Sequence, residues 1–97
     1  MGSEYDTGKI RDLARQVGRV AEDVADIRSR TENAIRREIP DNFAGSAAGA
    51  LSDTLSEWSV DVRNISSGLT QLQNTLYALA RRLDEIDAAA KAAISGK

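Results

Sequence analysis

The sequence contains no cysteine and no histidine, and its 97 residues include a single proline. Without these side chains the protein lacks a thiol nucleophile, a disulfide framework and an imidazole. Zinc sites, thiol proteases and serine-type relays therefore lose their usual parts. We expect no enzymatic activity, no catalytic residue and no cofactor. Only a thin core is possible at this length, because a small chain buries a smaller share of its surface than a large one.

An excess of charge of one sign is also missing, because 13 Lys and Arg stand against 15 Asp and Glu, which gives a net charge of −2. The two signs are interspersed along the chain, so no one-sided basic field can collect phosphates and nucleic acid binding is disfavoured. The apolar runs are too short to span a bilayer, and none follows the N-terminus as in a Sec signal peptide. We expect no membrane span and no Sec-dependent export.

Apolar residues recur at gaps of three and four along two long stretches, which is the pattern of amphipathic helices. The first stretch starts at Ile10 and predicts a helix over about 7–39, which Pro40 ends. Turn formers and helix-cap residues fill 40–46, and the second stretch predicts a helix over about 47–94. The predicted fold is all-α, an antiparallel two-helix hairpin that forms a single domain over the whole chain.

Two facing amphipathic helices leave apolar surface at their sides, and helical stability in water comes mostly from packing an apolar face. We therefore predict that the hairpin dimerises into a four-helix bundle, as a homodimer or as a heterodimer with another helical hairpin. Small residues beside the main stripe would let a further helix approach closely. The predicted dimer interface consists of Ala14, Gly18, Ala21, Ala25 and Trp58. For Trp58, core filling and partner recognition both stay open.

Two acidic clusters, within 22–26 and 84–87, could be imagined as carboxylate metal sites. Neither cluster has a histidine or a matching carboxylate pair on a facing helix, and a solvated helix face requires charged residues in any case. We interpret both clusters as solvated faces and predict no metal site.

Phe43 and Gly45 are the notable residues of the predicted turn. An aromatic ring at Phe43 must fold back onto the helix ends to leave water, and Gly45 permits an unusual backbone angle where the second helix starts. The segment Phe43, Ala44 and Gly45, between two long amphipathic helices, resembles the Trp-Xaa-Gly turn of the WXG (Esx) family of small type VII secretion system substrates. Phe43 takes the place of the Trp, and the resemblance covers nearly the whole chain.

The resemblance implies a non-enzymatic protein from a Gram-positive or actinobacterial source. Such a protein is cytoplasmic before export and leaves the cell folded, through a type VII system with its membrane ATPase. Members that carry the export signal have a Tyr followed four residues later by an acid near the C-terminus, whereas Tyr77 is followed at that spacing by Arg81. The family's broader pattern is an apolar residue, an acid and two apolar residues. The residues that fit it, as a secretion signal or partner-docking segment, are Leu83, Asp87, Ala90 and Ile94.

Geometry directs attention to the same end of the chain. If the hairpin folds about residues 42 and 43, the segment beyond about 83 has no partner within the chain, although its apolar stripe continues. A partner chain or receptor groove would cover such an overhang, and a frayed Ala-rich tail is the alternative. The rival functional hypothesis is a cytosolic targeting chaperone or adaptor that pairs with the helical N-terminal domain of a larger secreted toxin.

Overall fold

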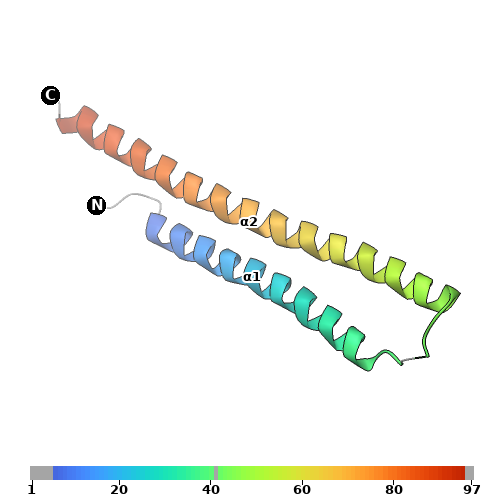
Figure 1. Cartoon of the computed structure of the whole chain (residues 1–97). Coiled ribbons are helices and arrows are strands. Elements are labelled where there is room, and N and C mark those ends of the chain that lie inside the picture. Colours follow the sequence, from blue (N-terminus) through green and yellow to red (C-terminus); the bar gives the residue numbers. More distant parts are fainter. Residues whose placement is uncertain (1–5, 41, 96–97) are drawn as a thin grey trace.

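The computed structural model describes residues 6–40 and 42–95, which form two long helices joined by a turn (Figure 1). Helix α1 spans Thr7–Glu38 and helix α2 spans Ser46–Ser95. The two helices run in opposite directions and pack against each other along the length of α1. The predicted all-α class and antiparallel hairpin are confirmed.

Helix α1 begins and ends at residues whose chemistry sets its limits. The Asp6 carboxylate accepts a hydrogen bond from the backbone N–H of Lys9 at 3.1 Å, which satisfies one free amide of the first turn. At the other end Ile39 has an extended backbone with ψ 131°, although its N–H still donates to the Ile35 carbonyl at 3.0 Å. Pro40 causes this change, because its ring disfavours a helical conformation in the preceding residue.

The turn between the helices depends on Gly45. This residue has a φ of 73°, in the left-handed region where a side chain would be strained. Its carbonyl accepts a hydrogen bond from the N–H of Gly49 at 3.1 Å, which forms the first turn of α2. The N–H of Phe43 donates to the Pro40 carbonyl at 3.0 Å and tightens the turn. The chain thus reverses through a few residues with defined hydrogen bonds.

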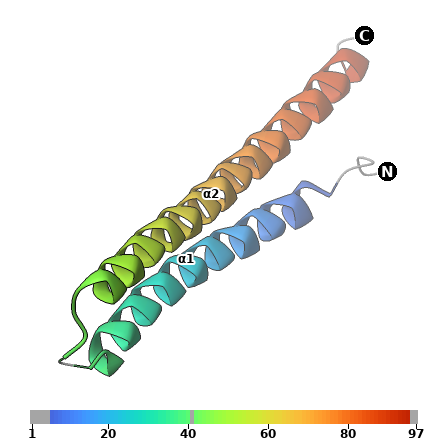
Figure 2. The ribbon, with the colours of Figure 1, turned by 90° about the vertical axis from the view of Figure 1, so that its right-hand side faces the viewer.

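Helix α2 is much longer than its partner, with 50 residues against 32 in α1. Its C-terminal part extends past the start of α1, as Figures 1 and 2 show from two directions. Near the point where α1 begins, the Arg11 guanidinium donates to the Asp84 carboxylate at 2.6 Å. The described residues of α2 after Asp84 form an overhang, residues 85–95.

Small and polar side chains occupy the contact between the helices. Ala14 and Ala80 are fully buried, and Gly18 lies so close to Gln73 that a Cβ on the glycine would overlap the Gln73 amide. The Ser66 hydroxyl donates to the Ala21 carbonyl at 3.0 Å. This narrow interior brings the helices close together but leaves little room for large apolar side chains.

Most of the large apolar side chains therefore divide into two sets with a spacing of seven residues. One set is half-buried or buried at the edge of the helix contact: Ile10, Val17 and Val24 on α1 and Leu55, Val62, Leu69, Leu76 and Leu83 on α2. The other set is between 43% and 56% exposed, and we call it the exposed stripe: Leu13, Val20 and Ile27 on α1 and Ile65, Leu72, Leu79 and Ile86 on α2. A single hairpin thus buries one of its two apolar sets, at least in part, and leaves the other about half exposed to solvent.

Candidate partner-binding surfaces

The exposed stripes of the two helices flank the same face of the hairpin. Within the paired region, each stripe residue directly precedes a residue on the side of the other helix, as Val20 precedes Ala21 and Leu79 precedes Ala80. In two antiparallel helices, the same step around each helix leads to the same side of the pair. The hairpin therefore has one exposed apolar face, which makes this side of the molecule the candidate interaction surface.

Three residues of the predicted dimer interface, Ala14, Gly18 and Ala21, lie buried against α2 of the same chain. The close helix approach that their size predicted occurs within the hairpin, and Ala25 is half-buried beside them. Trp58 is also half-buried, one heptad before the stripe residue Ile65. The role of these residues in a dimer stays a prediction. The exposed stripe was missed as a surface of its own, although its spacing of seven can be read in the sequence.

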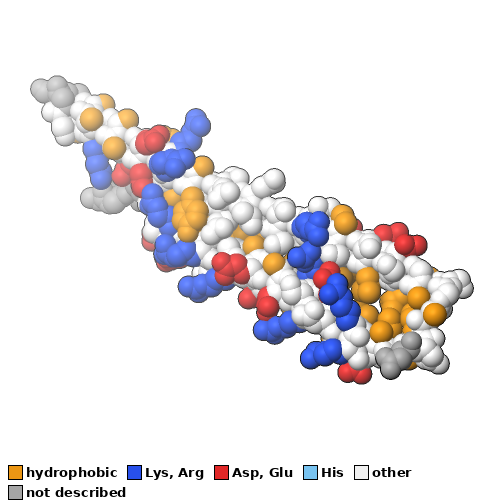
Figure 3. Space-filling view, in the orientation of Figure 1, with side chains coloured by type: hydrophobic (Ala, Val, Ile, Leu, Met, Phe, Trp, Pro, Cys, Tyr) orange, Lys and Arg blue, Asp and Glu red, His pale blue; other side chains and the backbone are white. Residues whose placement is uncertain are grey.

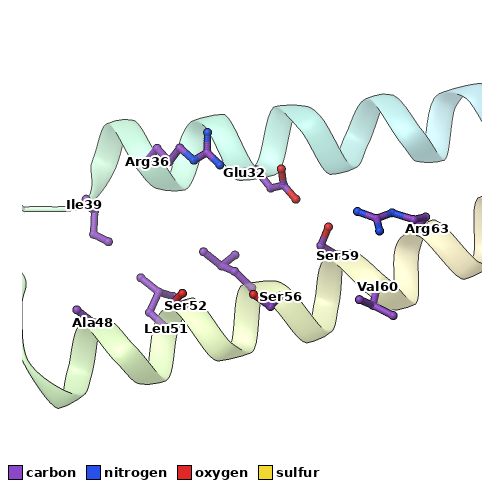
Figure 4. Close-up of a pocket in the computed structure, with 11 residues that line it drawn as sticks. Glu32, Arg36, Ile39, Ala48, Leu51, Ser52, Ser56, Ser59, Val60 and Arg63 are labelled. Atoms are coloured by element: carbon purple, nitrogen blue, oxygen red, sulfur yellow. The ribbon is translucent and has the colours of Figure 1, made fainter.

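A groove of about 500 Å³ opens between the helices at the turn end. Figure 4 shows Glu32, Arg36 and Ile39 on its α1 side, and Leu51 among the residues on its α2 side. Figure 3 shows hydrophobic side chains gathered at this end of the molecule, while charged side chains spread over most of the remaining length. The helices are splayed here, so the apolar lining is open to solvent. Phe43, in the turn next to the groove, is half-buried.

The candidate secretion segment lies where α2 leaves α1. Leu83 is half-buried at the end of the paired region, whereas Ala90 is exposed and Ile94 is 73% exposed. The Asp87 carboxylate forms an ion pair with Lys91 at 3.4 Å, one turn further along the helix. All four positions share one helix, on which Leu83 and Asp87 are half-buried while Ala90 and Ile94 are exposed. A partner could therefore reach the segment without opening the hairpin.

An ion pair between Arg11 and Asp84 joins the two helices at the end of the hairpin opposite the turn. Hydrogen bonds from Arg11 and Thr7 hold the pKa of the Asp84 carboxyl below its ordinary value of 3.8, with Arg11 the main cause. Both partners of the ion pair are about one-third to one-half exposed, at 36% and 47%, so solvent weakens their attraction. The pair therefore contributes more to the alignment of the two helices than to their stability.

Within residues 6–40 and 42–95, acidic side chains do not gather into a group that could hold a metal ion. In the same part of the chain, neither helix has a stretch apolar enough to cross a membrane. The turn of Phe43, Ala44 and Gly45 and the exposed apolar face define a class of small helical hairpins.

Comparison with known families agrees with this class. The family model WXG100, described as proteins of 100 residues with WXG, matches residues 3–88. The chain belongs to the WXG100 family. No curated protein and no solved structure matches it. Membership implies a small protein of the type VII secretion system, in a family whose members are non-enzymatic and typically pair as helical-hairpin dimers.

Proposed function

We propose that this protein is a non-enzymatic substrate, or a secretion partner, of a type VII system and that it leaves the cell folded as a helical-hairpin dimer. The observation that carries the proposal is the apolar face. Seven large apolar side chains of the exposed stripe stand about half in water on a chain that belongs to the WXG100 family. Burial of these side chains against a second hairpin would remove most of that apolar surface from water.

The overhang is the part of the hairpin that a secretion ATPase or a partner would contact. Ile94 continues an apolar stripe past the last contact with α1, and Asp87 lies on the same helix one turn after Leu83. An apolar helix face with one charge is the usual form of a helix that docks in a groove. The apolar side chains would supply contact area, and the carboxylate would set the orientation.

A secretion assay tests the proposal by comparing culture supernatant with cell pellet in a host with an active type VII system. Asp87→Ala should reduce the secreted fraction several-fold without loss of helicity. Asp53→Ala is the matched control, because it removes an exposed acid near the other end of α2. Equal secretion of both variants and the parent would show that Asp87 is not part of an export signal.

The second candidate function is a cytosolic adaptor or targeting chaperone for a larger secreted toxin with a helical N-terminal domain. Two observations favour it. Tyr77 is followed at the signal spacing by Arg81 instead of an acid, and the Asp87 charge is partly offset by Lys91. An adaptor would stay in the cell pellet and would co-purify with its cargo, so the same assay separates the two functions.

A further inference from the structure

The exposed stripe does not account for all of the exposed apolar surface. Among the described residues, seven of the ten exposed large hydrophobic side chains belong to it, and Ile94 lies on the overhang. The remaining two, Ile39 and Val60, are 37% and 50% exposed, and both line the groove at the turn end. The groove is thus a second apolar site, at the opposite end of α2 from the overhang.

The groove opens on the side of the hairpin opposite the exposed stripe. On its α2 wall Arg63 directly follows the buried Val62, and Ser56 directly follows the half-buried Leu55. The stripe residues directly precede residues of this kind. One step forward and one step backward turn by about 100° in opposite senses around a helix, so the two sets of side chains lie on opposite sides of the pair. A ligand in the groove would therefore leave the exposed stripe free.

The groove changes from apolar to polar along its length. The end next to the turn is bordered by three apolar side chains, those of Ile39, Ala48 and Leu51. At the end further from the turn, which we call the inner end, Figure 4 shows three polar side chains grouped together, those of Glu32, Ser59 and Arg63. A ligand that matches this arrangement has an apolar tail and a polar head group.

The charged side chains around the groove are mostly positive. Arg63 and Arg36 line it, and Arg28 donates a hydrogen bond at 3.3 Å to the hydroxyl of Ser59, which also lines it. Glu32 is the single acid among the described residues of the lining. Three guanidinium groups against one carboxylate favour an anionic head group. A carboxylate suits a guanidinium well, because the two can form a pair of parallel hydrogen bonds.

The size of the groove suits a single acyl chain. Its volume of about 500 Å³ lies in the usual range for small-molecule sites. Its α2 wall runs over the 15 residues from Ala48 to Arg63, a length of about 22 Å, which a stretched chain of about 16 carbon atoms also has. A partner helix of that length, with its side chains, would fill about 2,000 Å³. The groove is too small to enclose a helix.

We propose that the groove binds a free long-chain fatty acid, with its tail toward the turn and its carboxylate at Arg63. The tail would cover the apolar lining, including Ile39 and Leu51, and remove it from water. The serines of the α2 wall, among them Ser52, are small enough to leave room for the chain. The site goes beyond the proposed function and does not depend on it, because it lies away from both the overhang and the exposed stripe.

Binding of cis-parinarate, a fatty acid whose chain fluoresces in an apolar site, tests the proposal on the purified parent chain. The fluorescence should saturate at one probe per chain, and palmitate should displace the probe. Palmitoyl glycerol has the same tail without a charge and should compete at least ten-fold less well. Equal competition by this ester would overturn the role of the carboxylate. Tighter competition by palmitoyl lysophosphatidylglycerol would overturn the free fatty acid as the ligand in favour of a membrane lipid.

A second set of variants locates the probe. Ser52→Phe fills the groove from an exposed position and should weaken cis-parinarate binding at least ten-fold. Ser67→Phe is the matched control, because Ser67 is exposed on α2 outside the groove, and it should bind as the parent does. Loss of binding in Leu72→Asp, with Ser52→Phe unchanged, would place the probe on the exposed stripe and overturn the proposal.

Charge variants give changes of opposite sign. Arg63→Glu should weaken binding of cis-parinarate about ten-fold, whereas Glu32→Gln should strengthen it several-fold, because it removes a charge that repels the carboxylate. Arg81→Glu makes the same charge change as Arg63→Glu on an exposed residue of α2 outside the groove, and should have little effect. Circular dichroism checks that each variant is folded. Equal losses in Arg63→Glu and Arg81→Glu would overturn the placement of the head group. The proposed role in type VII secretion would still stand, because export is measured separately.

Discussion

The Gln73 amide lies over the backbone of Gly18, in the space that a Cβ on residue 18 would occupy. This contact joins the middle of α1 to the middle of α2. Because Gly18 has no side chain, α1 leaves a space at this position, and the Gln73 side chain of α2 fills it. The two helices can therefore approach closely here.

Substitutions at Gly18 test this contact. We expect Gly18→Ala to be nearly neutral, because a gain in helix propensity of about 1 kcal/mol is offset by displacement of the flexible Gln73 amide. Gly18→Leu should destabilise the hairpin by about 1–3 kcal/mol, the usual range for overpacking. Urea unfolding measures both effects. Gly68 has open space at its Cβ position, so Gly68→Leu is the control and should not destabilise.

Acidification should weaken the ion pair between Arg11 and Asp84 at the end of the hairpin opposite the turn. The folded pKa of Asp84 lies below 3.8, so its contribution is present above that value and is lost as the pH falls through the folded pKa. The melting temperature of the parent should therefore fall slightly more steeply below about pH 4 than that of Asp84→Asn. Asp12→Asn is the control, because Asp12 pairs with Arg15 within α1. Identical pH profiles for the parent and Asp84→Asn would contradict the assignment.

Phe43 should matter for stability in proportion to its burial. The ring is half-buried, so we expect Phe43→Ala to cost about 1.5–2.5 kcal/mol, half of the cost of truncating a fully buried aromatic side chain. Phe43→Trp restores the residue for which the family is named and should be tolerated. Thermal unfolding followed by circular dichroism measures both variants. An unchanged melting temperature for Phe43→Ala would show that the ring acts in recognition instead of packing.

The overhang should be dispensable for the hairpin itself. Deletion of residues 88–97 removes no contact between α1 and the described part of α2, because Arg11 meets α2 at Asp84. We expect the isolated monomer to keep its unfolding midpoint in urea. The secreted fraction should fall instead, because Ala90 and Ile94 of the candidate secretion segment are removed. A secretion assay and urea unfolding together separate the two effects.

The sequence predicted the hairpin because its signals are local. A period near 3.6, the break at Pro40 and the glycine at Gly45 each act within about one turn of the helix. It did not predict which small residues face the neighbouring helix. That choice depends on the rotation of α1 against α2, and contacts such as that of Ser66 with the Ala21 carbonyl set it. The apolar positions of each helix were predicted as one stripe, and only the packed structure separates the set that the chain buries from the set that it exposes.

The narrow interior of the hairpin has a calorimetric consequence. Only four hydrophobic side chains among the described residues are buried, three of them alanines. Unfolding of a lone hairpin would expose little new apolar surface, and the heat capacity of unfolding follows that area. A single chain should therefore show a shallow, broad transition with a small heat-capacity change. Association should add a large negative heat-capacity change of its own, so calorimetry would record more of the protein's hydrophobic effect between chains than within one.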